Sequence, residues 1–425
     1  MSNRRCEGPK APKQSRREFL GALAGASSAY AALPLLRTVE MQDSESAWRA
    51  LQSEFSFGSR LIPMNAANMC PPPRSVTSAV EAANRSVDAD VSFHNRAQYN
   101  ALRETVRAAV ARFLDGDPDE FAIIRNASEG NNIVVAGLPL RPRDEVLITD
   151  QNHPSNGLAW EAQAARRGFT VTRVALPANP SGGDELAAAV TRAITAATRV
   201  LAFSDVSNSS GMRLPVAELC RVGRERGIHV HIDGAQTMGA MRLSMRELDA
   251  GSYTASTQKW LMGPREGGVL FVRKDLIPNV QPAVISRGFS DPADPGPLSA
   301  KKLDMLGQRN EGVMAGFGAA IAFVERVGIE RIQARVEALA AQLTAGLRDI
   351  AGYRLVTPSA PGCSLGVVVG RFEGLDHQKL HDRLYHGHGV ASAPTGGLRL
   401  CAHIYNTMAD LDRAIRAVAV AKGEL

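Results

Sequence analysis

Ile228-His-Val-His-Ile-Asp-Gly-Ala-Gln236, followed by Ser256-Thr-Gln-Lys259, is the most informative part of this 425-residue sequence. The apolar run predicts a buried strand that ends at Asp233, where a carboxylate is costly unless it is paired. Taken alone, Asp233 also fits a helix N-cap, and Lys259 fits a solvated surface charge. A buried lysine beside a carboxylate and a cationic site, however, has a lowered pKa and can act as a Schiff-base amine.

Short apolar runs alternate with helical stretches around this segment. We expect strands near 146–148, 171–174, 200–203, 228–232 and 267–272, and helices near 155–167, 184–196 and 215–226. This alternation is typical of an α/β fold with a mainly parallel sheet that helices cover on both faces.

Polar clusters follow the predicted strands at four points. They are Asn152–Asn156, Ser207-Asn208, Asp233–Gln236 and Ser256–Lys259. Each alone fits a turn or a helix cap. In open α/β sheets, however, ligands bind at the carboxyl ends of the strands, so four such clusters in series predict a binding site at one sheet edge.

The flanking regions predict a second, smaller unit. Helices are expected near 45–55 and 98–114, long Ala-rich helices at 310–327 and 329–350, and a last helix from Ala409. We expect an N-terminal segment (37–74) that packs with the small domain, a large domain (75–300) and a small α+β domain (301–425).

Residues 1–36 contain, in order, the charged region, the apolar region and the small-residue cleavage triplet of a signal peptide. Ser15-Arg16-Arg17-Glu18-Phe19-Leu20 precedes a weakly apolar run from Gly21 to Leu36, which contains the small-x-small triplet Ala29-Tyr30-Ala31. The paired arginines with Phe-Leu resemble a twin-arginine (Tat) signal. We therefore expect a periplasmic protein exported by the Tat machinery, without stable membrane insertion; a disordered basic tail is the alternative.

The charge and the cysteines exclude several other classes. The net charge is +6, of which +4 lies in residues 1–36, so nucleic-acid binding is not supported. The composition, with 44% hydrophobic and 22% charged residues, is that of a globular protein. Cys6, Cys70, Cys220, Cys363 and Cys401 form no C-x-x-C pair and have no His at metal-ligand spacing, so no metal site is expected.

Taken together, these motifs resemble class V aminotransferases of the pyridoxal phosphate (PLP) fold type I. The resemblance covers roughly residues 60–420 and rests on Asn65-Ala-Ala, Arg125-Asn-Ala-Ser128-Glu129-Gly-Asn-Asn132, His153-Pro-Ser-Asn156, Val206-Ser-Asn208-Ser-Ser-Gly211, Asp233-Gly-Ala-Gln236, Ser256-Thr-Gln-Lys259 and Leu398-Arg399 with Tyr405-Asn406-Thr407. It implies a seven-stranded, mainly parallel sheet in the large domain, PLP as cofactor, and a homodimer.

The resemblance also implies roles around the cofactor ring. Lys259 would form the Schiff base and move a proton at the substrate α-carbon. Asp233 would keep the pyridine nitrogen protonated, so that the ring acts as an electron sink. His153 would stack on the ring, and Asn208 and Gln236 would hydrogen-bond its phenolic oxygen.

The phosphate of the cofactor would lie at a helix start. Free backbone N–H groups after Ala127-Ser128 would attract it, with hydroxyls from Ser128 and Ser256. Gln258 stands where many relatives have His. Gln308, at a position where Thr is more usual, matches the segment that relatives extend to the phosphate of the neighbouring subunit.

Arg399 would bind the substrate carboxylate bidentately, with Asn65 of the entry strand beside it; the alternative for Arg399 is a structural salt bridge.

Desulfurases of this family need a nucleophilic cysteine on the loop before this arginine. Here that loop, Ala391–Leu398, has none. A persulfide mechanism is therefore disfavoured.

The ending Leu398–Thr407 resembles the isopenicillin N epimerase-like branch, which includes exported Tat-dependent relatives that modify pyoverdine siderophores. The leading hypothesis is transamination or a related deamination of an amino acid or a peptide-borne amino acid. Epimerisation would need a second base on the opposite face of the cofactor, and the sequence does not point to a residue for this role. C–S lysis needs only a suitable leaving group on the substrate, so the sequence does not exclude it. A catalytically inert PLP-binding protein is the alternative from another class.

Overall fold

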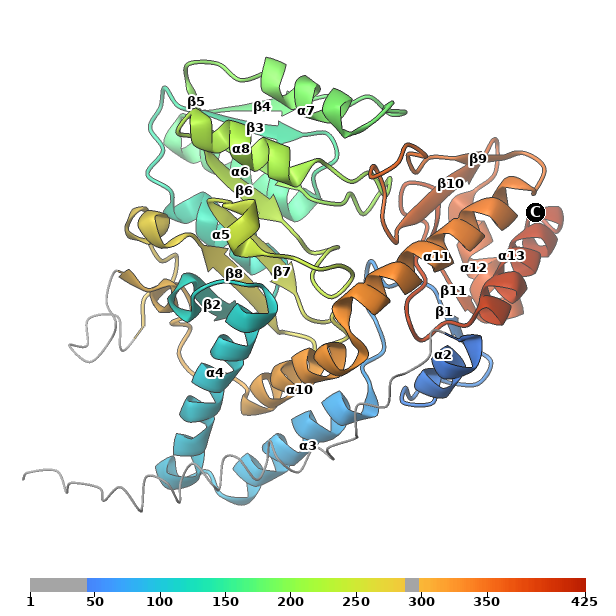
Figure 1. Ribbon diagram of the computed structural model, residues 1–425, viewed down its shortest axis with the longest axis horizontal. Helices are drawn as coiled ribbons and strands as arrows, with labels where there is room; N and C mark the ends of the chain where they lie inside the picture. The colour runs from blue at the N-terminus through green and yellow to red at the C-terminus, as the bar shows by residue number, and fades with distance from the viewer. Residues whose placement is uncertain (1–43, 287–297) are drawn as a thin grey trace, which may run out of the picture.

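A seven-stranded sheet forms the centre of the large domain (Figure 1). The computed structural model describes residues 44–286 and 298–425. The strand order is β2-β8-β7-β6-β5-β3-β4, with bounds β2 Phe121–Ile124, β3 Glu145–Thr149, β4 Thr170–Val174, β5 Thr198–Ser204, β6 His229–Asp233, β7 Ser252–Ser256 and β8 Gly268–Val272. Only the two ladders of β8 are antiparallel. The predicted fold class is confirmed.

Helices cover both faces of this sheet because its strands alternate apolar side chains between two cores. Val146 and Ile148 of β3 pack with α5 (Ala127–Gly137) and α6 (Pro154–Arg167). Leu147 of the same strand packs in a second core, with α7 (Gly183–Arg192), α8 (Val216–Glu225) and α10 (Glu311–Val327). The carboxyl ends of the parallel strands remain at one edge.

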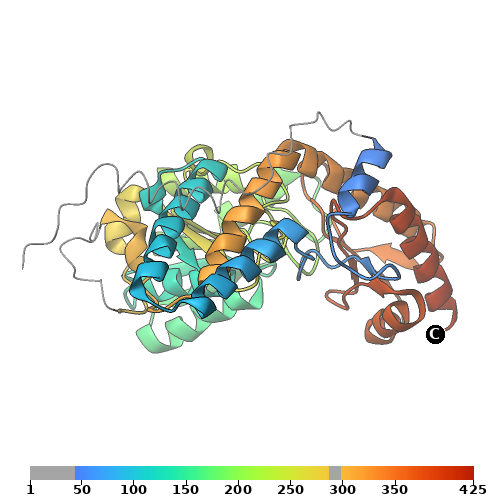
Figure 2. The ribbon, with the colours of Figure 1, turned by 90° about the horizontal axis from the view of Figure 1, so that it is seen from below.

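The small domain has its own sheet and core. Its strands β9 (Tyr353–Leu355), β10 (Val368–Phe372) and β12 (Leu398–Leu400) pair antiparallel, and β1 (Ile62–Pro63) pairs with β11 (Val390–Ala391). Its helices are α11 (Ile329–Arg348), α12 (His377–His388) and α13 (Met408–Gly423). Figures 1 and 2 show two lobes, with α11 running from the end of α10 into the smaller one.

The N-terminal segment contacts the end of the chain. Helix α2 (Glu45–Gln52) lies beside the small domain in Figure 1. Gln52 Nε2 donates to the Tyr405 carbonyl at 2.8 Å, and Arg335 Nη1 lies 2.8 Å from Glu45 Oε2. These contacts join the first described helix to both α11 and the segment before α13.

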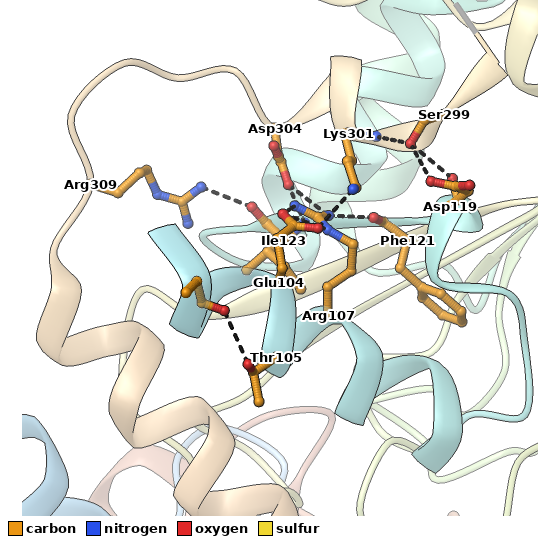
Figure 3. Close-up of polar contacts among 11 residues, drawn as sticks. Glu104, Thr105, Arg107, Asp119, Phe121, Ile123, Ser299, Lys301, Asp304 and Arg309 are labelled. Carbon is orange, nitrogen blue, oxygen red and sulfur yellow. Dashed lines mark hydrogen bonds and ion pairs between the residues drawn. The ribbon is translucent and has the colours of Figure 1, made fainter. Parts of the chain in front are cut away.

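Helix α10 packs on α3 (Arg74–Ala89) and α4 (Phe93–Phe113), and the segment before it is held on edge strand β2. Figure 3 shows the contacts. Arg107 Nη1 lies 3.0 Å from Asp304 Oδ2, and both side chains are buried. The same carboxylate oxygen accepts from the Ile123 N–H at 2.9 Å, and Arg309 Nη1 donates to the Ile123 carbonyl at 2.8 Å.

Two further sequence expectations concern membranes and export. Within residues 44–286 and 298–425, no single helix is long and apolar enough to cross a membrane; only α10 and α11 together pass by length and composition, and they are bent by 79°. The proposed signal peptide, residues 1–36, lies outside the described residues.

Candidate active site

The carboxyl ends of β3, β5, β6 and β7 bring the predicted polar clusters to one edge of the sheet. Lys259 follows β7 and interacts electrostatically with Asp233 at the end of β6 and with Arg399 on β12. His153, which follows β3, interacts with the same three charges. Residues that lie up to 246 positions apart in the sequence therefore share one site between the two domains.

Asp233 is a buried carboxylate that hydrogen bonds hold at both oxygens. Asn131 Nδ2 donates to Oδ2 at 3.0 Å, and the Ala235 N–H donates to Oδ1 at 3.1 Å. Asp233 is only 3% exposed and forms no ion pair within 4 Å among the described residues. Such a carboxylate is suited to a cationic group of a ligand, because an unpaired buried charge is costly.

Lys259 is half-buried, and no described residue accepts a hydrogen bond from its amine. Burial lowers its pKa below the usual value; the carboxylate of Asp233 acts in the opposite direction, and the cation of Arg399 adds to the effect of burial. A lysine with a lowered pKa is more often neutral and is therefore a better nucleophile and base.

His153 is fixed at the start of α6, where it is the N-cap. Its Nδ1 lies 2.7 Å from Ser155 Oγ and accepts from the Ser155 N–H at 3.2 Å, while the backbone N–H of His153 donates to Ser204 Oγ at 3.1 Å. Burial lowers the pKa of His153. A neutral imidazole with a fixed orientation is suited to stack on an aromatic ligand.

The start of α5 forms the part of the site that is suited to an anion. The Ala127 N–H donates to Ser256 Oγ at 2.8 Å, and the side chain of Asn126 caps the helix at Glu129. Ser128 is exposed. Gln258 Oε1 is buried and has no hydrogen-bond partner among the described residues. A buried acceptor without a partner is costly, but an anion has no hydrogen to donate to it, so this oxygen is not itself a phosphate ligand.

Asn208 and Gln236, the two residues predicted to bind the ring oxygen, differ in how many of their side-chain hydrogen-bonding groups are already used. Asn208 uses its backbone carbonyl to accept from Arg399, and its side chain forms no hydrogen bond with the described residues. Gln236 is already engaged at both ends, because Nε2 donates to the Ala67 carbonyl at 3.0 Å and Oε1 accepts from Trp260 Nε1 at 2.7 Å. Its second N–H is the one donor that remains for the ring oxygen of a ligand.

Arg399 is buried without a carboxylate partner. Its Nη1 donates to the Asn208 carbonyl at 2.9 Å, and its Nη2 donates to Asn65 Oδ1 at 2.8 Å. Its Nε is buried with no partner, and no acidic side chain of the described residues lies within salt-bridge distance. The geometry therefore gives no support to the structural salt bridge that the sequence left open.

Gln308 lies away from this cluster in the single chain. It is exposed beside Arg96, in a cavity of about 280 Å³ between α4 and the segment before α10, and that cavity is lined by none of Lys259, Asp233, His153 and Arg399. Its contact with the phosphate of a neighbouring subunit requires a second chain and stays a prediction.

The cysteines lie outside the chemistry of the site. Cys70, Cys220, Cys363 and Cys401 are free and buried. Burial raises the pKa of Cys401, although it follows Arg399 closely in the sequence. Among the described residues, no group of three or more His, Cys, Asp or Glu side chains could hold a metal ion.

Sequence reasoning missed the residues behind Asp233. Asn131 lies within the Arg125–Asn132 motif and His231 within the strand before Asp233, and neither position by itself indicated a role. The two side chains meet at 2.9 Å although they are 100 positions apart. The only available signal was the alternation of His229, His231 and Asp233 on one face of the strand.

Known proteins share the sequence family and the fold of this chain. The family model "Aminotransferase class-V" matches residues 65–420. Isopenicillin N epimerase of Streptomyces clavuligerus is 28% identical over 89% of this chain and 99% of its own length, and that of Amycolatopsis lactamdurans is 30% identical over 88% and 98%. Two solved structures share the fold. A cysteine desulfurase of Escherichia coli is 22% identical with a TM-score of 0.79, over 90% of this chain and 99% of that chain. A cystine C–S lyase is 23% identical with a TM-score of 0.77, over 84% of this chain and 96% of that chain.

Proposed function

The chain belongs to the class-V aminotransferase family of PLP-dependent enzymes, and on this premise we propose that it acts on the primary amine of an amino acid, free or peptide-borne, by transamination or a related deamination. The observation that carries the proposal is Arg399: a buried cation, positioned by Asn65 and Asn208, with no carboxylate partner. It is coupled electrostatically to Lys259. A substrate with a carboxylate next to its amine matches both groups.

The residues present fit PLP. The buried Nε of Arg399 lacks a partner among the described residues, as expected of a donor that binds an anionic group of a ligand. The Asp233 carboxylate is matched to a protonated pyridine nitrogen, and the start of α5 is matched to a phosphate. When bound, PLP supplies an electron sink for the negative charge that develops at the substrate α-carbon.

The protein side chains supply binding, orientation and proton transfer. Arg399 binds the substrate carboxylate and thereby fixes the α-carbon. Lys259 takes up and returns the α-proton, for which its lowered pKa is suited. Asp233 would hold a proton on the ring nitrogen, and His153 would stack on the ring.

Incubation of the PLP-loaded protein with a panel of L- and D-amino acids in deuterated water tests this proposal. We expect exchange of the α-proton and formation of a keto acid, both lost in Lys259→Ala. A spectrum that no amino acid changes would instead support a PLP-binding protein without turnover. Absence of bound PLP after reconstitution would contradict the assignment of the site.

Epimerisation is the second candidate, because both epimerase relatives match along nearly their whole length. The same incubation separates it from transamination: inversion of the α-carbon without any keto acid supports an epimerase. A C–S lyase would instead release a sulfur product from cystine or cysteine. Persulfide formation on the enzyme is disfavoured, since the 391–398 loop has no cysteine and Cys401 is buried.

We also propose that the protein is exported by the Tat route and works in the periplasm as a homodimer. The order of charged, apolar and small-residue segments in residues 1–36 supports export. Replacement of Arg16-Arg17 by Lys-Lys should leave the protein in the cytoplasm; continued export would refute the Tat assignment.

The exposed Gln308 segment is compatible with a dimer, which light scattering of the purified protein tests.

A further inference from the structure

Asn131, on α5, joins the buried carboxylate of Asp233 to a buried histidine. It is fully buried, and its Nδ2 donates to Asp233 Oδ2 at 3.0 Å. Its Oδ1 lies 2.9 Å from Nε2 of His231, which is also fully buried. His231 Nδ1 lies 2.8 Å from Ser252 Oγ, and His229 Nε2 lies 2.8 Å from the same hydroxyl.

The direction of each hydrogen bond in this chain follows from Asp233. An ionised carboxylate only accepts, so Asn131 must present its NH₂ group to it and its oxygen to His231. His231 must then carry its proton on Nε2, which leaves Nδ1 to accept from the Ser252 hydroxyl. That hydroxyl in turn accepts from His229 Nε2. The donors from His229 to Asn131 therefore point along one path towards Asp233, and the Asn131 NH₂ group has a longer second contact, 3.5 Å, with Ser155 Oγ.

The surroundings of His231 keep it neutral. Besides Asn131 and Ser252, its ring meets the edge of the Trp160 ring, with centroids 6.5 Å apart. Burial and the neighbouring His229 lower the pKa of His231 to about 3. A neutral histidine offers one donor and one acceptor, which matches its two partners; cooperative polarisation strengthens the bonds of such a chain.

We propose that Asn131 and His231 are positioning residues: they hold the Asp233 carboxylate in one orientation, in which it keeps the ring nitrogen of the bound cofactor protonated. The inference rests on the proposed role of Asp233. Asn131 contributes the contact, and His231 fixes which end of the Asn131 amide faces the carboxylate. Neither side chain is placed to touch the substrate, since both lie behind Asp233 in the core.

The protonation state of the cofactor nitrogen tests the proposal directly. The apoprotein is loaded with PLP labelled with ¹⁵N in its ring, and the chemical shift of that nitrogen is measured in the wild type, Asn131→Leu, Asn131→Ala, His231→Phe and His231→Gln. We expect a protonated shift in the wild type and a movement towards the unprotonated value in the two Asn131 variants and in His231→Phe. His231→Gln keeps a donor for Asn131 and should restore most of the wild-type shift.

We expect the turnover rates of these variants to follow the same order as their ring-nitrogen shifts. Loss of one hydrogen bond to a charged group should lower kcat by about ten- to a hundredfold in Asn131→Leu and leave KM nearly unchanged. Ser244→Ala is the matched control: Ser244 is a buried hydroxyl of the same domain that bonds Asp115 at 2.6 Å and caps α9 (Met245–Leu248). It should cost stability without moving the nitrogen signal.

The outcomes separate this inference from the function proposed above. A protonated ring nitrogen in both Asn131 variants would overturn the positioning role, even if turnover fell, because only packing would then have been lost. An unprotonated nitrogen in the wild type would overturn the role of Asp233 and this inference with it. If His231→Phe does not fold, the Asn131→Ala variant, which adds no bulk, decides the question.

Discussion

Removal of the Arg399 side chain should weaken turnover only for substrates that carry a carboxylate. A guanidinium has five N–H groups. Two are used, one by the Asn208 carbonyl and one by Asn65 Oδ1, which leaves three for a ligand. One of these is the N–H on Nε, which is buried without a partner. The site is thus arranged for a bidentate carboxylate.

The magnitude follows from the burial of Arg399, which is 4% exposed. Truncation of one partner of a buried charge pair costs about 2–5 kcal/mol, which corresponds to a loss of about 30- to 5000-fold in kcat/KM. Arg399→Lys should recover only part of this loss, because an ammonium is a point charge that cannot hold both carboxylate oxygens in one plane.

Steady-state kinetics with an amino acid and its decarboxylated amine measure the effect. In Arg399→Ala the amino acid should lose its advantage, while the amine, which has no carboxylate to bind, should react as it does with the wild type. Arg354→Ala, which breaks an exposed pair with Glu373 on the small domain, is the control and should leave both substrates unchanged. An equal loss for amino acid and amine in Arg399→Ala would refute the reasoning.

Three further predictions follow from the same structure. Asp304→Asn removes the buried one of the two carboxylates that pair with Arg107 and leaves only the half-exposed Glu104, so it should lower the free energy of unfolding by about 3–5 kcal/mol in urea titrations; Glu218→Gln, at an exposed pair, should cost less than about 1 kcal/mol, and equal losses would contradict the prediction. Lys259→Ala should abolish the visible absorbance of the PLP-loaded protein and leave its far-ultraviolet circular dichroism unchanged; a retained visible band would place the cofactor on another amine. Stability should fall as the pH falls below about 6.5, because burial holds the pKa of His231 at about 3 and only the unfolded chain takes up that proton in between. Thermal melting at several pH values measures this, and a melting temperature that is constant down to pH about 4 would be inconsistent with it.

The sequence alone indicated the parallel part of the sheet and the residues at its edge. Strands such as β3 and β5 contain apolar runs, because helices cover both of their faces, and such runs can be recognised without a structure. Polar residues directly after those runs predicted a site, since the carboxyl ends of parallel strands must meet at one edge.

Strand β7 and the residues behind Asp233 could be found only in the tertiary structure. All five residues of β7, Ser252 to Ser256, are buried although three of them are Ser or Thr. Those hydroxyls bond partners far away in the sequence: Ser252 meets His231, Thr254 donates to the Val269 carbonyl, and Ser256 accepts from the Ala127 N–H. A pattern of apolar residues cannot reveal such a strand, because its burial depends on hydrogen bonds that only the folded chain brings together.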